Sequence, residues 1–249
     1  MIDPIAFTIA GISVRWYGII LAAGFLFSFW FSGKLAPQRN IKKEDIYDLF
    51  VYLIPAILIG ARIFHIVSQW SYYSADPIKM LYIWQGGIAF HGGFIGAFLA
   101  IYIFCRARKI KTYDVLDILV IPLALGLSVG RIGNFINQEF YGKPTNLPWG
   151  IYFDNVEGKR HPSQIYETIK NFVIFLILYN LYKVRKIKSG NIFWSFVFLY
   201  SLFRFFVEFY KDLPDLFFGL TWGQLWSVPL FILSVVFLYF INRKKVKHE

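Results

Sequence analysis

Seven long apolar segments dominate this sequence of 249 residues. Each is close to the ~20 residues that an α-helix needs to cross the hydrocarbon core of a bilayer. Strands of a membrane barrel would instead show ~10 residues of alternating polarity. The pattern predicts an all-α polytopic membrane protein with seven transmembrane helices, forming a single integral membrane domain over residues 1–249. The predicted spans are residues 14–33, 47–68, 86–104, 113–136, 164–182, 190–210 and 222–241.

The basic residues give the predicted orientation of these helices. The net charge of +11 would suggest nucleic acid as the partner of a soluble protein. Hydrophobic residues make up 57% of this chain, however, and most of the Lys and Arg residues cluster at every second end of an apolar segment. The positive-inside rule therefore places the N-terminus outside, the C-terminus in the cytoplasm, and predicts no nucleic acid partner. The clustered residues are Lys34, Arg39, Lys42, Lys43, Arg106, Arg108, Lys109, Lys111, Lys183, Arg185, Lys186, Lys188, Arg243, Lys244, Lys245 and Lys247.

The longest connection between apolar segments covers residues 138–163, between the fourth and fifth predicted spans. On this orientation it lies outside the membrane. It contains Pro144, Pro148 and Trp149, which favour an ordered loop over a flexible linker. We therefore predict a small external cap over these residues.

Polar and ionisable residues occur inside or beside every predicted span. Such groups are costly in a membrane, so they are expected to be functional or paired. The direction of each span places these residues toward the outer face, which predicts one polar cavity near the outer leaflet. The residues are Tyr17, Arg62, His65, His91, Arg131, Asn134, Asn137, Glu139, His161, Gln164, Glu167, Arg204, Glu208 and Gln224.

Several of these residues also have a purely structural interpretation. Arg204 and Glu208 are four residues apart, so they would neutralise each other along one face of a helix. Arg62 and His65 would form a satisfied internal contact. Tyr17, next to a tryptophan, is typical of an aromatic anchor at the membrane interface.

Small residues and a lysine inside the spans have structural interpretations as well. The pairs Gly92 with Gly96 and Gly126 with Gly130 have the spacing that lets helices pack closely. Lys170 would extend toward a lipid headgroup. Ser128 lies in a Gly-x-Ser-x-Gly pattern typical of serine hydrolases, which needs a strand turning into a helix. Here the pattern lies in an apolar helix, so we do not expect Ser128 to be catalytic.

The most unusual stretch runs from Gly130 to Gly142, with the sequence GRIGNFINQEFYG. It resembles the signature of the prolipoprotein diacylglyceryl transferase family. Four further elements of the sequence fit that family in the same order along the chain. They are Arg15-Trp16-Tyr17-Gly18, Phe90-His91-Gly92-Gly93, His161-Pro162-Ser163-Gln164-Ile165-Tyr166-Glu167 and the pair Arg204 and Glu208.

The resemblance implies a bacterial plasma-membrane transferase with its active site toward the outer leaflet. The diacylglyceryl group of phosphatidylglycerol would move to the lipobox cysteine thiol in the signal peptide of a prolipoprotein, forming a thioether and releasing glycerol phosphate. This would be the first step of bacterial lipoprotein maturation. The implied catalytic residues are Tyr17, His91, Arg131, Glu139, Arg204 and Glu208. The implied lipid-binding residues are Arg131, Asn134, Asn137, Gly142, Gln164 and Arg204.

The chemistry of this reaction suits these residue types. Two guanidiniums, Arg131 and Arg204, match a phosphodiester whose negative charge grows as it leaves. His91 is the expected base for the incoming thiol, because imidazole titrates near neutrality. We expect the two carboxylates, Glu139 and Glu208, to orient the arginines. Asn134 and Tyr17 would bind the headgroup and Gly142 would permit a close turn, and we expect no metal and no cofactor.

Two other functions remain open from the residues alone. A small-anion transporter would line its path with Arg62, Arg131 and Arg204, but it would need polar residues through both halves of the membrane. An intramembrane hydrolase would use Ser128, which lies in the wrong structural context. A lateral lipid site fits better, because the inner halves of the spans are almost purely apolar.

Overall fold

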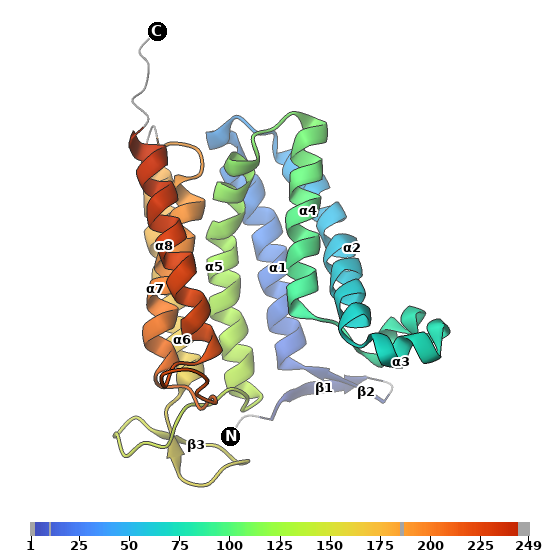
Figure 1. Cartoon of the computed structure of the whole chain (residues 1–249), viewed down its shortest axis with the longest axis vertical. Coiled ribbons are helices and arrows are strands. Elements are labelled where there is room, and N and C mark those ends of the chain that lie inside the picture. Colours follow the sequence, from blue (N-terminus) through green and yellow to red (C-terminus); the bar gives the residue numbers. More distant parts are fainter. Residues whose placement is uncertain (1–2, 10, 185–186, 244–249) are drawn as a thin grey trace. The chain divides into compact units, whose positions relative to one another are not determined.

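The computed structural model describes residues 3–9, 11–184 and 187–243 (Figure 1). The chain packs as two compact units, one formed by Met1–Trp30 with Leu116–Glu249 and the other by Phe31–Val115. Five of the basic residues that mark the predicted orientation lie outside the described residues: Arg185, Lys186, Lys244, Lys245 and Lys247.

Each of the seven predicted apolar segments forms a helix, which confirms a mostly helical fold. The long helices are α1 (Trp16–Leu35), α2 (Lys43–Ser68), α4 (Phe90–Arg108), α5 (Thr112–Ile136), α6 (Ser163–Lys183), α7 (Asn191–Glu208) and α8 (Trp222–Arg243). Shorter elements are the helix α3 (Trp70–Ala75) and the 3-10 turns Ala36–Arg39, Pro77–Leu81 and Ile83–Gln85.

Within the described part of the chain, six helices are long and apolar enough to cross a membrane. They are α1 together with the turn that follows it, α2, α4, α5, α7 and α8. Helix α6 is as long as the others, but Gln164, Glu167, Lys170 and Asn171 make its first half polar. Length and composition therefore support six of the seven predicted spans, and α6 is the one that they do not support.

Hydrogen bonds and stacked rings hold the helices of the first unit together. The Ser128 hydroxyl on α5 donates to the Thr168 carbonyl on α6 over 2.8 Å, and the Thr168 hydroxyl donates back to the Ser128 carbonyl. Ser128 thus lies inside a helix and serves packing, as predicted. Helices α7 and α8 stack the rings of Trp194 and Phe237 with centroids 4.2 Å apart.

Side chains cap two helix ends in this unit. The buried carboxylate of Asp117 on α5 accepts the backbone N–H groups of Gly190 and Phe193, at 2.9 and 2.8 Å. These donors have no partner within α7 itself, and a negative charge is favourable at a helix N-terminus. At the end of α8, the Lys188 ammonium donates to the carbonyls of Ile241 and Asn242. These contacts fix where α7 begins and where α8 ends.

In the second unit, α2 and α4 cross at closely packed small residues. A Cβ added to Gly92 would lie 2.2 Å from the Gly60 carbonyl oxygen, and one added to Gly96 equally close to that of Ala56. The prediction for Gly92 and Gly96 is confirmed. The prediction for Gly126 and Gly130 is wrong, because a Cβ at Gly126 meets nothing within 4 Å and one at Gly130 meets only Leu21, at 3.8 Å.

The connection between α5 and α6 is ordered, as the sequence predicts. Strand β3 (Ile151–Tyr152) pairs antiparallel with β4 (Lys159–Arg160), and Pro144 forms a bridge to Arg160. A second hairpin, which the sequence analysis missed, pairs β1 (Ile5–Ile9) with β2 (Ile12–Arg15). The large apolar side chains of β1 are exposed, whereas a strand of a soluble protein would bury them against a core.

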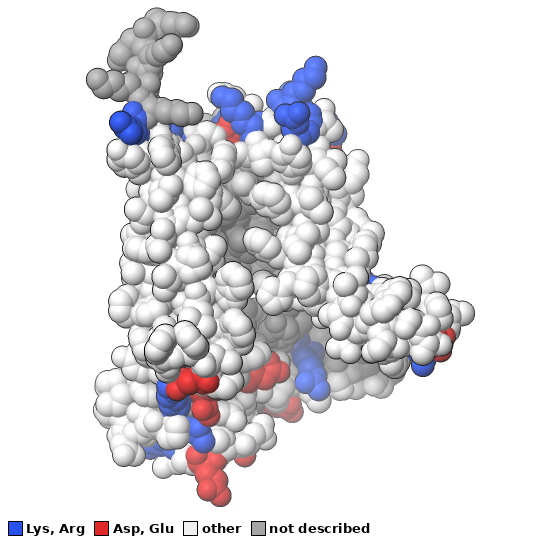
Figure 2. Space-filling view, in the orientation of Figure 1, with Lys and Arg blue, Asp and Glu red and all other residues white. Residues whose placement is uncertain are grey.

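The surface of the first unit has an uncharged stretch along its helices. Figure 2 shows no Lys, Arg, Asp or Glu side chain on the visible surface over α7 and α8 between the ends of these helices. Large apolar side chains are exposed there, including Trp226 at 65% and Ile232 at 57% of their full area. A soluble protein does not expose so much contiguous apolar surface, so these helices are suited to contact lipid.

Candidate functional site

The end of α5 gathers four of the predicted site residues in one turn. After Ile136 the chain reverses at Gln138 and Phe140, which both have φ of +57°, and the Glu139 N–H donates to the Asn134 carbonyl. The reversal brings the Glu139 carboxylate to the side-chain amides of Asn134 and Asn137, each 3.3 Å away. We call Arg131, Asn134, Asn137 and Glu139 the turn cluster.

Arg131 is held in the turn cluster through an amide. Its guanidinium lies 3.5 Å from the Asn134 amide oxygen and 5.8 Å from the centre of the Phe140 ring. Glu139 contacts the two amides, so its orienting effect on Arg131 is indirect. This arrangement leaves most of the guanidinium donors available to an anion, because a side-chain amide oxygen takes only one of the five.

Tyr17 packs directly on the same end of α5. A Cβ added to Gly133 would lie 2.7 Å from a ring carbon of Tyr17, so only glycine permits this contact. Tyr17 lies in the first turn of α1, and the contact joins the start of α1 to the end of α5 beside the turn cluster. An aromatic anchor at the membrane interface would not need this contact with Gly133, so the structure favours a role for Tyr17 in positioning the start of α1 against α5.

Gly142 lies where two distant segments meet. Its N–H donates to the His161 carbonyl over 2.8 Å, and the next N–H, of Lys143, donates to the Tyr210 carbonyl. A Cβ on Gly142 would lie 2.3 Å from that Tyr210 oxygen and 2.7 Å from the Cβ of His161. Gly142 does not have the positive φ of a tight turn. The predicted close turn is therefore wrong: glycine is needed for the close approach of the segments before α6 and after α7.

Gly142→Ala is expected to destabilise the protein by about 2 kcal/mol, because the added methyl overlaps backbone atoms that cannot move independently. Gly126→Ala is the matched control, since its Cβ meets nothing. That control should be neutral or stabilising by ~0.5–1 kcal/mol, as for any helical Gly replaced by Ala. Thermal unfolding of both variants in detergent measures the difference. Equal melting temperatures would contradict the close approach at Gly142.

The first turn of α6 binds the turn cluster. The Gln164 amide donates to the Glu139 carbonyl over 2.7 Å, and the Ser163 hydroxyl donates to the Phe140 carbonyl. Gln164 is almost fully buried, with 1% of its area exposed. Gln164 and Glu167 lie one turn apart on α6, so this helix links the turn cluster to a second group of polar residues.

An aromatic group surrounds His161, just before α6. The His161 Nδ1 lies 3.0 Å from the Tyr166 hydroxyl, which also accepts a hydrogen bond from the Trp149 indole. The Tyr210 ring packs against His161, with centroids 5.1 Å apart. Burial lowers the pKa of His161 below its ordinary value. The imidazole is therefore neutral near pH 7, which suits a structural contact with a phenol.

The second polar group is a set of five charged residues that join α6 to α7. Lys211 Nζ lies 2.7 Å from a Glu167 oxygen and 3.2 Å from a Glu208 oxygen. Arg204 Nε lies 3.7 Å from the same Glu208 oxygen. Lys170 is buried and paired with Glu167, so the prediction that it reaches a lipid headgroup is wrong. We call Glu167, Lys170, Arg204, Glu208 and Lys211 the ion cluster.

Arg62, in the second unit, has a structural role. Its guanidinium donates to the carbonyls of Lys79, Met80, Gly86 and Gly87, over 2.6 to 3.0 Å. It fastens the segment between α3 and α4 to the end of α2. An anion on a transport path would have to compete with these four acceptors, so the structure does not support Arg62 as part of such a path.

His91 occupies the first turn of α4, also in the second unit. Its imidazole is exposed and packs against the rings of Phe64 and Phe90, both with centroids 6.0 Å away. Among the described residues, no hydrogen bond to the imidazole nitrogens is present. Both nitrogens are thus accessible, which a general base requires.

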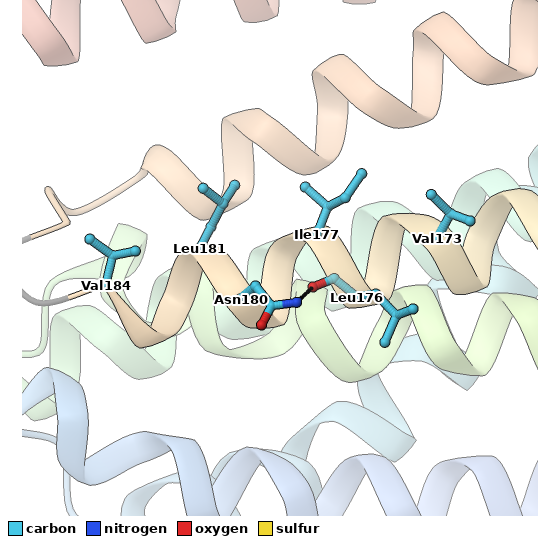
Figure 3. Close-up of a pocket in the computed structure, with 6 residues that line it drawn as sticks. All are labelled: Val173, Leu176, Ile177, Asn180, Leu181 and Val184. Carbon is cyan, nitrogen blue, oxygen red and sulfur yellow. Dashed lines mark hydrogen bonds between the residues drawn. The ribbon is translucent and has the colours of Figure 1, made fainter.

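A shallow apolar groove follows the far end of α6 (Figure 3). Its lining includes Val173, Ile177 and Leu181, and the Asn180 amide in it donates to the Leu176 carbonyl. The groove holds no charged group and lies at the opposite end of α6 from Gln164. It is suited to apolar contacts and not to the reaction itself.

The structure therefore joins most predicted site residues within the first unit. Tyr17, Asn134, Glu139, Gly142 and Gln164 are connected with Arg131 and Asn137 around the end of α5, and Arg204 and Glu208 connect with α6 through Lys211. Sequence reasoning missed Lys211 as a member of the site. Its spacing of three residues from Glu208 was a usable signal. In the described part of the chain, no group of three or more His, Cys, Asp or Glu residues is placed to hold a metal ion.

These observations define a helical membrane protein whose polar site combines arginines, amides and carboxylates at the helix ends. Residues 4–240 match the sequence model of the prolipoprotein diacylglyceryl transferase family, and the chain belongs to this family. A protein of Finegoldia magna named phosphatidylglycerol–prolipoprotein diacylglyceryl transferase is 38% identical over 99% of both chains. Proteins of the same name are 38% identical in Geobacter sulfurreducens, over 98% of this chain and 97% of the relative, and 40% identical in Clostridioides difficile, over 83% and 82%.

Proposed function

We propose that this chain moves the diacylglyceryl group of phosphatidylglycerol to the cysteine thiol of a prolipoprotein, with the turn cluster, Arg204 and Glu208 as its lipid site. Family membership over nearly the whole chain supports the reaction. A carbon–sulfur bond forms, the carbon–oxygen bond to the phosphate breaks, and glycerol phosphate leaves. The thiol loses its proton, and the departing phosphate gains negative charge.

Arg131 and Arg204 bind the phosphate in this proposal. The leaving phosphate approaches two negative charges, and two guanidiniums match that charge with paired hydrogen bonds. Such interactions are stronger in a site that excludes water than in bulk solvent. The support is that Arg131 bonds only to one amide oxygen, and that Arg204 Nε is buried without a hydrogen-bond partner among the described residues.

The amides bind the headgroup glycerol of phosphatidylglycerol. Asn137 and Gln164 each turn the NH₂ group toward Glu139, which leaves the amide oxygens buried without a partner in the described part of the chain. Buried acceptors of this kind are costly unless a ligand satisfies them. The glycerol hydroxyls are donors and suit these oxygens. Asn134 and Tyr17 complete the contacts to the lipid, and His91 takes the proton of the incoming thiol.

Seven membrane crossings are proposed: the six helices that are apolar enough by themselves, together with α6. The charges on α6 lie inside the protein, since Glu167 and Lys170 are paired and only 2% and 4% of their side-chain areas are exposed. Buried pairing removes most of the cost of charge in a membrane span. An odd number of crossings puts the two termini on opposite sides of the membrane. The clusters of basic residues then support an orientation with the N-terminus and the segment 138–163 outside, the C-terminus in the cytoplasm and the site toward the outer leaflet.

Cysteine labelling of intact cells tests this topology. Cys105 is the only cysteine of the chain and is buried, so Cys105→Ala gives a clean background. Glu157→Cys in the proposed cap should react with a membrane-impermeant maleimide, whereas Lys109→Cys should react only after the membrane is opened. Labelling of Lys109→Cys in intact cells would contradict the proposed orientation.

The function is tested with purified protein in detergent, phosphatidylglycerol and a lipobox peptide. We expect mass spectrometry to show a diacylglyceryl mass on the peptide, together with free glycerol phosphate. A peptide with serine in place of cysteine is the control and should not gain mass. An unmodified cysteine peptide, with folded protein and both substrates present, would overturn the assignment.

A further inference from the structure

The ion cluster carries more positive than negative charge, and its ion pairs differ in length. It contains three cations and two carboxylates, so its net charge is +1. Both carboxylates are nearly inaccessible, with 2% of the side-chain area exposed, while the Arg204 side chain is 37% exposed. The excess positive charge is therefore presented on the arginine, which is the member that a ligand can reach.

Lys211 is the link between the two carboxylates. It lies three residues beyond the end of α7 and reaches Glu167 on α6 at 2.7 Å and Glu208 on α7 at 3.2 Å. Arg204 approaches the same Glu208 oxygen only to 3.7 Å, and its Nε makes no hydrogen bond among the described residues. Because attraction falls with distance, Lys211 is the stronger partner of Glu208.

Tyr200 adds a second contact to Arg204. Its hydroxyl lies 3.5 Å from the Arg204 Nη1, and its ring lies 4.3 Å from the Lys170 ammonium. The hydroxyl contact is at the long end of hydrogen bonding, and the ring contact involves Lys170 and not the guanidinium. The charge of Arg204 is thus only partly compensated within the protein.

We propose that Lys211 is a positioning residue that binds Glu208 and thereby keeps the Arg204 guanidinium free for the phosphate of the lipid substrate. The inference deepens the proposed function and rests on it. Without Lys211, Glu208 would close the 3.7 Å gap to Arg204 and occupy the donors that the phosphate needs. The residue acts through Glu208 and Arg204 and does not itself touch the substrate.

The test compares Lys211→Met with Lys211→Arg in steady-state transfer assays. Loss of a charge-assisted hydrogen bond to the substrate predicts that Lys211→Met raises the KM for phosphatidylglycerol about tenfold. The KM for the lipobox peptide should change less than about twofold, because the peptide carries no phosphate for Arg204 to bind. Lys211→Arg keeps the cation and should restore the lipid KM to within about threefold of the parent value.

Lys170→Met is the matched control within the same cluster. Lys170 pairs with Glu167 but has no contact with Glu208 in the described structure. We expect its KM for phosphatidylglycerol to stay within about threefold of the parent value. Equal rises in both KM values for Lys211→Met, or equal effects of Lys170→Met and Lys211→Met, would show that Lys211 only holds the helices together and would overturn the proposal.

Two further measurements keep the inference testable if Lys211→Met does not fold or if transfer fails. Glu167→Gln leaves Lys211 to bind Glu208 alone, so the lipid KM should stay level or fall, and a rise would contradict the proposal.

Calorimetric binding of glycerol phosphate needs no turnover. The binding should be about tenfold weaker in Lys211→Met than in the parent protein, and Lys211→Gln takes the place of Lys211→Met if that variant does not fold. An inactive parent protein that still shows this difference would reject the proposed function and keep the inference.

Discussion

Arg131→Lys and Arg204→Lys are each expected to lower kcat/KM about 100-fold, the usual cost of removing one donor to a developing anion. Lysine keeps the charge but lacks the planar pair of donors that matches two phosphate oxygens. Arg131 bonds weakly to Asn134, and Arg204 is only partly neutralised by Glu208, so both guanidiniums keep donors that a phosphate can use. The loss should appear in transfer kinetics with phosphatidylglycerol.

Arg243→Lys is the matched control for both substitutions. Arg243 ends α8 and lies over the Tyr239 ring, far along that helix from Gln224 at its start. Its kinetics should match those of the parent protein. If either site variant retained parental kcat/KM while remaining folded, that arginine would have no part in binding the phosphate.

His91→Gln is expected to lower kcat about 100-fold at pH 7, within the range that general-base catalysis contributes. The exposed imidazole in the first turn of α4 is free to accept a proton, and glutamine preserves its size but not its basicity. The incoming thiol has a reference pKa of ~8.5. Raising the pH toward 9 forms the thiolate without a base, so the deficit of the variant should shrink with increasing pH.

His65→Gln is the control for this pH profile. His65 lies in the same unit near the end of α2, and its ring packs edge-on against Tyr73. This variant should show the parental pH dependence. A constant ratio between the rates of the parent and His91→Gln from pH 6 to 9 would mean that His91 does not remove the thiol proton.

The helices were predictable from the sequence, and their ends less so. The predicted second span begins at residue 47, but α2 begins at Lys43, because charged residues are acceptable in the first turn of a helix while an apolar pattern omits them. The predicted third span begins at residue 86, but α4 begins at Phe90, since Gly86 and Gly87 adopt positive φ and end the preceding turn. Local chemistry at the ends sets these bounds.

The site was predictable where its members are close in sequence. Arg131, Asn134 and Glu139 fall in one short motif, and the structure joins them in one turn. The pair of Lys211 with Glu167 spans more than forty residues, and the acceptors of Arg62 are backbone carbonyls. No local pattern reports which distant groups fold against each other, so these contacts needed the three-dimensional structure.

The buried charges of α6 also bear on how the protein is made. Glu167 and Lys170 pair with each other, but they still make the first half of this helix a poor candidate to enter lipid alone, because even paired charges are costly where they face hydrocarbon. A second cation that binds Glu167, Lys211, is synthesised only after α7, and seven residues separate α6 from α7. We therefore expect the two helices to leave the insertion machinery together as a hairpin, so that α6 is retained in the membrane only once α7 has arrived.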